Sequence, residues 1–180
     1  MATRMVHRLS FAGVLAAFLC AQLSAQQVNE YDIKAAYVFN LTKFVEWPPQ
    51  VFKNGADPIK ICIFGQSPVQ EALLEAVKGE RIDDRTLLVR QVAAVEQVRG
   101  CHLVFIASSE RKRALAILED LKTSGTLTVG ETESFLDEGG AVNFRLEGNK
   151  VRIEVNLNAV ERQGLRISPK LLSLTRVVRK

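Results

Sequence analysis

The stretch Ile59–Val77, which reads IKICIFGQSPVQEALLEAV, decides the fold. Its opening residues, Ile59–Phe64, form a near-continuous apolar run of the kind found in strands that are buried on both faces of a sheet. The segment Gly65–Pro68 is a tight turn, because Ser67 caps a helix and proline is favoured in a first helical turn. The stretch therefore predicts a strand, a turn and a helix in succession.

A second unit of the same kind begins with the apolar run His102–Ala107. Two strand-and-helix units in series predict parallel strands that are covered by helices. In the helix of this second unit, apolar residues recur at helical spacing, at Ala114, Ile117, Leu118 and Leu121. We therefore expect one α/β domain with a mixed, largely parallel sheet flanked by helices, a Rossmann-like arrangement.

Shorter elements fill the rest of the chain. An amphipathic helix is expected at Asp32–Val45, and the prolines after Trp47 stop it, because proline lacks the amide hydrogen that a helix needs. The other expected elements are strands at Arg81–Asp83, Thr86–Arg90 and Thr126–Val129, and short helices at Glu131–Glu138, at Asn156–Gln163 and from Ser168.

A β-hairpin is the clearest local pattern. Apolar and polar residues alternate along Val142–Glu147 and again along Val151–Asn156, and Gly148-Asn149 forms a two-residue turn between them. That loop places Leu146 opposite Val151, and the other apolar residues pair in the same register, Phe144 with Ile153 and Val142 with Val155. One face of the hairpin is therefore expected to be wholly apolar.

The opposite face of this hairpin places Arg145 beside Arg152. Two like charges that face each other across a strand pair cost a few tenths of a kcal/mol, unless a carboxylate intervenes. Glu147 and Glu154 are the nearby candidates for that role. The functional alternative is that an acidic partner molecule, and not a carboxylate of this chain, neutralises the two arginines.

The N-terminus reads as an export signal. Arg4 and Arg8 belong to a basic segment, Phe11–Leu23 is apolar, and small residues ending at Ala25 approximate a cleavage site. We predict a signal peptide at residues 1–25 and one exported domain at residues 26–180. A retained N-terminal anchor is the alternative.

Two cysteines, Cys62 and Cys101, remain after that cleavage. Oxidising compartments let cysteine pairs persist as disulfides, so we predict a bridge between them. Each lies in or beside an apolar run, and two neighbouring strands would bring their Cα atoms to bridging distance. Two buried free thiols are the alternative.

Several classes of function lack support. The net charge is +4, and Arg4 and Arg8 lie in the predicted signal peptide, so no nucleic-acid footprint is evident. Four Cys or His ligands for a structural zinc ion are not available after cleavage, and no cofactor motif is present. A catalyst built on Cys101 and His102 is disfavoured, because consecutive strand residues point to opposite faces.

The carboxylate pairs Asp83-Asp84 and Asp137-Glu138 have no acid–base or metal motif around them. Gly65, at a junction of strand and helix, is a weak signal for anion binding. A small ligand at the carboxyl ends of the parallel strands stays open as an alternative function.

The segment Tyr31–Pro48, YDIKAAYVFNLTKFVEWP, resembles the opening signature of the YfiR family. The resemblance continues through the rest of the chain in order and spacing, at residues 61–65, at residues 101–106, at Gly139-Gly140 with the hairpin after it, and at residues 156–172. The aromatic helix that ends in Phe-x-x-Trp-Pro is its most specific part.

The resemblance implies a periplasmic regulator and not an enzyme. Such a protein restrains an inner-membrane diguanylate cyclase by binding its periplasmic sensor region, and an outer-membrane OmpA-like lipoprotein releases the restraint. The output is cyclic-di-GMP, with biofilm formation downstream, and a homodimer is expected. Cys62 and Cys101 occupy the family's disulfide positions, whereas a further cysteine pair of some members is absent here.

For the partner-binding surface we predict Glu154, Val160, Arg162 and Arg166. The late hairpin and the segment after it are expected to expose charge beside apolar residues such as Val160. The alternative to a protein-binding regulator is a periplasmic domain that senses a small molecule.

Overall fold

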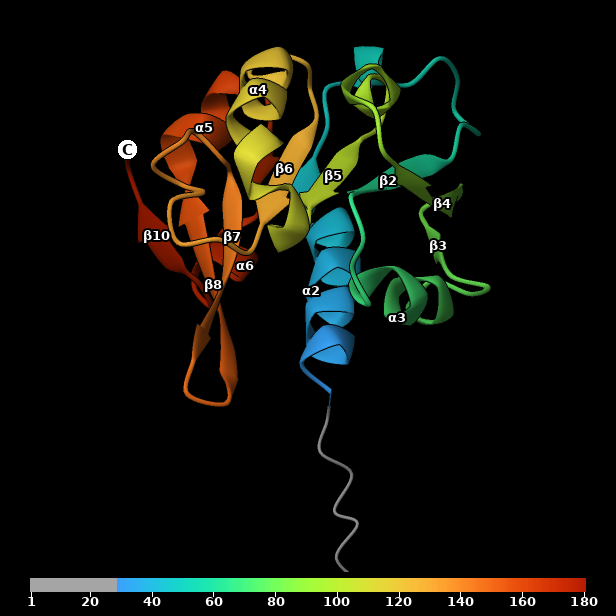
Figure 1. Ribbon diagram of the computed structural model, residues 1–180. Coiled ribbons are helices and arrows are strands. Elements are labelled where there is room, and N and C mark those ends of the chain that lie inside the picture. The colour runs from blue at the N-terminus through green and yellow to red at the C-terminus, as the bar shows by residue number, and fades with distance from the viewer. Residues whose placement is uncertain (1–28) are drawn as a thin grey trace, which may run out of the picture.

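The computed structural model describes residues 29–180, which form a sheet with helices on both faces (Figure 1). The predicted signal peptide, residues 1–25, lies outside the described residues. The helices are α2 Glu30–Phe44, α3 Val69–Ala76, α4 Arg111–Leu121, α5 Leu157–Arg162 and α6 Pro169–Leu172, with 3-10 helices at Pro49–Val51, Val95–Val98 and Ser108–Glu110. The strands are β1 Val45–Glu46, β2 Ile59–Phe64, β3 Arg81–Ile82, β4 Arg85–Val92, β5 Leu103–Ile106, β6 Leu127–Gly130, β7 Val142–Glu147, β8 Lys150–Asn156, β9 Arg166–Ile167 and β10 Arg176–Val178.

The main sheet has eight strands in the order β10-β8-β7-β6-β5-β2-β4-β3. Its centre, from β4 to β7, is parallel, while β3 pairs antiparallel with β4 and β8 pairs antiparallel with β7. This confirms the α/β fold with a mixed, largely parallel sheet. The strands β1 and β9 form a separate two-stranded sheet.

Two hydrophobic layers explain why the central strands read as continuous apolar runs. Ile61 and Ile63 point to the layer that contains α2 and α3, whereas Cys62 and Phe64 point to the layer that contains α4. All four side chains are fully buried. A strand that is covered on both faces favours apolar side chains at successive positions, which is the pattern of a parallel sheet between helices.

The segment after α2 is anchored by aromatic residues. The Trp47 indole donates a hydrogen bond to the His102 carbonyl, N···O 3.1 Å, and the Phe52 ring stacks on the His102 ring with centroids 4.4 Å apart. Trp47 and Phe52 thus attach this segment to the start of β5. The prolines do not end the helix, because α2 ends at Phe44 and strand β1 separates it from Pro48.

The predicted disulfide is present between Cys62 on β2 and Cys101 just before β5, with Cα atoms 6.1 Å apart. The Arg90 guanidinium lies against both sulfur atoms, with Nε 3.2 Å from Cys62 Sγ and Nη2 3.4 Å from Cys101 Sγ. The bridge ties neighbouring parallel strands within the layer that α4 covers.

The helix predicted at Glu131–Glu138 is wrong: this segment is a series of turns. Phe135 is buried at its centre, and a Cβ atom added at either Gly130 or Gly140 would collide with the Phe135 ring. The chain folds back on itself here because the Phe135 ring packs between Gly130 and Gly140, which have no side chains that would occupy its place.

The hairpin register is confirmed: Leu146 pairs with Val151, Phe144 with Ile153 and Val142 with Val155. The strands β1, β9 and β10 were not predicted, because two or three residues carry no detectable periodicity. Across residues 29–180, none of the helices has the length and apolar character required to span a membrane.

Candidate partner-binding surface

The hairpin extends past the strand beside it. The β6–β7 pairing stops where Gly130 lies opposite Asn143, whereas the β7–β8 pairing continues to Glu147 opposite Lys150. We call the part beyond this point, residues 144–153, the hairpin arm. Figure 1 shows it reaching beyond the other strands, at the opposite side of the molecule from α3.

The arm is held by its inner face. Phe144 is buried, with its ring centroid 6.0 Å from that of Tyr37 on α2 and 6.2 Å from that of Phe105 on β5. The face is apolar as far as the tip, as expected, but it is not covered there, because the Leu146 side chain is 52% exposed. The hairpin overhangs its support there, so Leu146 borders an open hollow beside Ile33.

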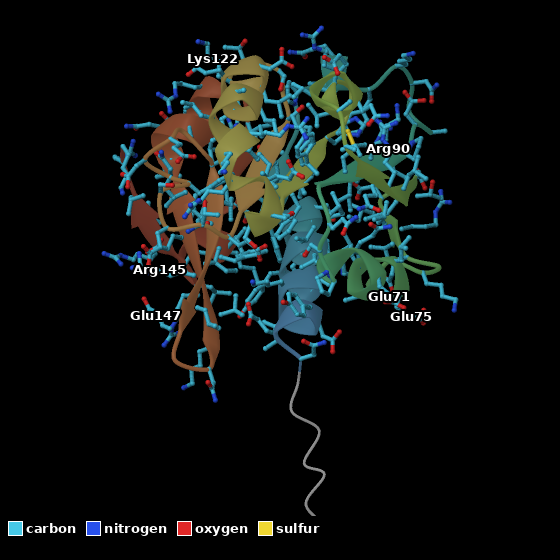
Figure 2. The ribbon with its side chains drawn as sticks, viewed as in Figure 1. Glu71, Glu75, Arg90, Lys122, Arg145 and Glu147 are labelled. Carbon is cyan, nitrogen blue, oxygen red and sulfur yellow. A yellow bond between two sulfur atoms is a disulfide. The ribbon has the colours of Figure 1, made fainter. Side chains whose placement is uncertain are left out.

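The outer face of the arm is basic. Arg145 lies directly opposite Arg152, and both side chains are exposed. Arg152 has a distant ion pair with Glu147, N···O 3.7 Å, whereas within residues 29–180 Arg145 has no ion pair. Figure 2 shows the labelled Arg145 and Glu147 side chains along this part of the hairpin.

Strand β10 extends this face. Arg176 is in register with Glu154, and their side chains form an ion pair with an N···O distance of 3.2 Å. Because strand neighbours in register share a face and side chains alternate, Arg145, Arg152 and Arg176 all lie on one face of the sheet. We call these three residues the basic stripe.

The predicted partner-binding residues differ in how exposed they are. Glu154 is only 7% exposed and is engaged by Arg176. The predicted exposure of Val160 is wrong: its side chain is 1% exposed, because this side of α5 packs into the core. Arg162 and Arg166 are exposed.

These residues do not form one surface. Arg166 belongs to the separate β1–β9 sheet, where it lies opposite Glu46, and Arg162 ends α5 near Gly139. Residues on three elements with different orientations cannot be grouped from sequence separation alone. Arg145 and Arg152 were singled out by the alternating pattern. The place of Arg176 beside them could not be predicted from the sequence, because the short strand β10 has no detectable periodicity.

Both ring nitrogens of His102 lie against backbone groups of the protein. Its Nδ1 accepts a hydrogen bond from the Lys60 amide, N···N 2.9 Å, and its Nε2 lies 3.4 Å from the Val51 carbonyl oxygen. Burial lowers the pKa of His102 below its ordinary value, which favours the neutral ring. With Cys101 in the disulfide, neither side chain is placed as a nucleophile or its base.

The turn after β2 is also filled by the protein. A Cβ atom at Gly65 would collide with the Glu110 side chain, and the Ser109 hydroxyl donates to the Gln66 carbonyl, O···O 3.3 Å. The two strands β2 and β5 end here, where an open α/β sheet commonly binds its ligand. Protein side chains occupy that place in this chain.

A second place lies at the carboxyl ends of β5 and β6. A cavity of about 790 Å³ is lined there by serines and by charged side chains, among them Lys112 and Glu131. Glu131 already accepts hydrogen bonds from the Lys34 ammonium, at 2.7 Å, and from the Ser108 amide, at 2.9 Å. Within residues 29–180, no three His, Cys, Asp or Glu side chains gather as a metal site would require.

Two solved structures resemble this one. A conserved domain protein from Vibrio cholerae O1 biovar El Tor has 9% sequence identity and a TM-score of 0.53, over 82% of this chain and 60% of that chain. The ABC domain from Streptococcus pneumoniae, solved in complex with L-Trp, has 8% identity and a TM-score of 0.48, over 66% of this chain and 55% of that one. This chain thus spans less than two thirds of either, and the likeness to the Vibrio chain is one of fold alone.

A family model described as YfiR/HmsC-like matches residues 31–176. That range contains Trp47-Pro48, both cysteines and the whole late hairpin. The chain therefore belongs to the YfiR/HmsC-like family, whose members are periplasmic regulators in cyclic-di-GMP signalling.

Proposed function

We propose that this protein restrains an inner-membrane diguanylate cyclase by binding the cyclase's periplasmic region through the basic stripe and the tip of the hairpin arm. An outer-membrane OmpA-like lipoprotein relieves the restraint by sequestering the protein. The chain acts by binding and not by catalysis. Residues 1–25 direct it to the periplasm and are removed there.

One observation carries the choice of surface: Arg145 and Arg152 face each other at the overhanging end of a hairpin. Like charges in this register destabilise the fold by about 0.2–1 kcal/mol. Residues 29–180 provide only one distant carboxylate, Glu147, for the pair. An acidic partner supplies the missing negative charge when it binds.

The chemistry of the basic stripe determines which kind of partner can bind it. Planar guanidinium groups bind carboxylates through two parallel hydrogen bonds, so an acidic segment of the cyclase's periplasmic region is the expected ligand. The exposed Leu146 lies on the opposite, inner face of the hairpin tip, so a partner that wraps around the tip gains an apolar contact there. Rim charges of this kind mainly increase the rate of association and select the partner.

The test is the cellular level of cyclic-di-GMP in the host after deletion of this protein. We expect the level to rise on deletion and to return when the full chain is restored. A form that lacks residues 1–25 is the matched control and should not restore the level, because it stays on the wrong side of the membrane. An unchanged level on deletion would contradict the proposal.

The second candidate function is a sensor of a small molecule. The cavity of about 790 Å³ at the ends of β5 and β6 favours it, because its volume is within the range of ligand sites. Under this alternative, protein purified from the periplasm retains a ligand, and Arg111→Glu, at the rim of this cavity, abolishes function while Arg145→Glu preserves it.

A further inference from the structure

A cavity apart from the surfaces described above lies between α4, α5 and the turns that precede β7. Figure 1 shows α4 and α5 beside each other, and both contribute to its lining. Its volume is about 670 Å³, which is within the range of small-molecule sites. The buried side chains of Leu118, Leu136 and Ala159 make up its apolar part. We call it the α4–α5 cavity.

Gln163, in the wall of this cavity, has an acceptor that the protein does not use. The residue is 2% exposed, and its Nε2 donates a hydrogen bond to Thr128 Oγ1 on β6, N···O 2.9 Å. Within residues 29–180, no donor reaches its Oε1. Because buried polar groups nearly always have a partner, an unpaired amide oxygen in a cavity wall indicates a donor from outside the chain.

Glu138 supplies a second unused acceptor in the same cavity. Its backbone amide donates to the Ser134 carbonyl, N···O 2.9 Å, and the Ser134 hydroxyl donates to its Oε1, O···O 2.6 Å. These two hydrogen bonds hold the carboxylate in place. Its other oxygen, Oε2, is buried and has no hydrogen-bond partner in the described part of the chain. The cavity is therefore lined by two acceptors, from two separate elements, that await donors.

Glu138 also differs in charge pairing from the other carboxylates that line the cavity. Glu119 pairs with Lys122, which Figure 2 labels near the end of α4, at an N···O distance of 2.7 Å. Asp137 pairs with Lys180 at 2.5 Å. Among residues 29–180, Glu138 has no such cation. A positively charged ligand would complete the pairing.

The two acceptors and the apolar lining together define the chemistry of the ligand. An ammonium group has three N–H donors and no acceptor, so it can satisfy a carboxylate oxygen and an amide oxygen at once. Leu115, 54% exposed at the cavity, and the buried Leu118 offer a hydrocarbon surface beside them. An aliphatic body bound there removes apolar area from water.

We propose that the α4–α5 cavity binds a primary organic ammonium ion with an aliphatic body. The ammonium group donates to Glu138 Oε2 and Gln163 Oε1, and the hydrocarbon covers Leu115. Such a group comes from an aliphatic amine or from an amino acid, and the exposed Arg162 in the cavity lining holds the carboxylate of the latter. This inference is independent of the proposed function, because no residue of the basic stripe lines the cavity.

The test is calorimetric titration of the protein, purified from the periplasm, with cadaverine as the probe. We expect one-to-one binding of cadaverine and no binding of the uncharged diol of the same length. Glu138→Gln keeps an acceptor for Ser134 but removes the charge, so it should weaken binding by at least about tenfold. Leu115→Ser, at an exposed position, should also weaken it. The matched control is Glu133→Gln, an exposed carboxylate of the same turns that lines the cavity at β5 and β6 instead, and its affinity should equal that of the wild type.

Amide chemical shifts provide the second readout, because they show where the probe lies. Cadaverine should move the resonances of Leu118, Leu136 and Gly139, and leave those of Ser108 and Thr132 at the other cavity unchanged. Leucine as a second probe identifies the source of the ligand. A site for amino acids binds leucine more tightly than cadaverine and loses that preference in Arg162→Gln, whereas a site for amines binds cadaverine more tightly.

The proposal is overturned if the wild type binds neither cadaverine nor leucine. Equal affinities of the wild type and Glu138→Gln would overturn it as well, as would shifts confined to the cavity at β5 and β6. None of these results affects the cyclic-di-GMP test, which reports on the basic stripe.

Discussion

The protonation state of His102 links a single side chain to the stability of the fold. The buried ring has its pKa lowered from 6.5 chiefly by desolvation, with the Val51 carbonyl opposing the shift and Lys60 and Arg85 adding to it. The unfolded chain therefore binds a proton at a pH where the folded chain does not. This contribution to stability is complete above pH 6.5 and is lost as the pH falls below it.

We expect wild-type protein to lose more unfolding free energy than His102→Asn as the pH falls from about 7 to about 5. Asparagine offers an oxygen in the place of Nδ1 for the Lys60 amide, but it does not titrate. Urea unfolding at a series of pH values measures the difference. Parallel pH profiles for the two proteins would show that His102 does not contribute.

Arg145 provides a second test at this scale, because stability and function should respond in opposite directions. Arg145→Thr removes the repulsion from Arg152 and introduces a good strand former, so we expect a gain of about 0.2–1 kcal/mol in unfolding free energy. Urea unfolding measures it. A loss of stability would mean that Arg145 has a structural role, and the case for a binding surface would weaken.

At the scale of elements, short patterns with a strict period were predictable and isolated pairings were not. The register of β7 and β8 follows from alternation around a two-residue turn. The turns at residues 131–138 were mistaken for a helix, because the reason for them is Phe135 packing between Gly130 and Gly140, which are close in space only after folding. Strand β10 depends on β8 as its partner and has no period of its own.

Gly140→Ala tests that packing. A methyl group at this position collides with the Phe135 ring and with the Phe135 carbonyl oxygen, so we expect a loss of about 1–3 kcal/mol in unfolding free energy. Denaturant unfolding measures the loss. Gly55→Ala is the control, because no atom lies within 4 Å of the added carbon there. Equal stabilities of the two variants would contradict the packing argument.

At the scale of the whole molecule, the α/β class and the disulfide were predictable, but the functional surface was only partly so. The hairpin register makes Arg145 and Arg152 neighbours. Their exposure has another cause: β7 extends past the end of β6, and this difference is seen only in the assembled sheet. Val160 was wrongly predicted to be exposed, because this valine of a short helix lies in the core.

The disulfide is a property of the whole chain, because it closes a loop with a sequence separation of 39. Chain entropy predicts that removing it costs about 4 kcal/mol. We expect the double variant Cys62→Ala with Cys101→Ala to unfold at a lower urea concentration than the wild type, and the reduced wild type to match the variant. An unchanged midpoint would show that the bridge adds nothing to stability.

The restraint of cyclic-di-GMP synthesis through the basic stripe is tested most directly by restoring Arg145→Glu to a host that lacks the protein. This change turns the repulsive pair with Arg152 into an attractive one, so the fold is kept while one of the three positive charges of the stripe becomes negative. We predict that cyclic-di-GMP stays high with Arg145→Glu and returns to its normal level with Arg111→Glu, the matched control on α4. A normal level with Arg145→Glu would contradict the account.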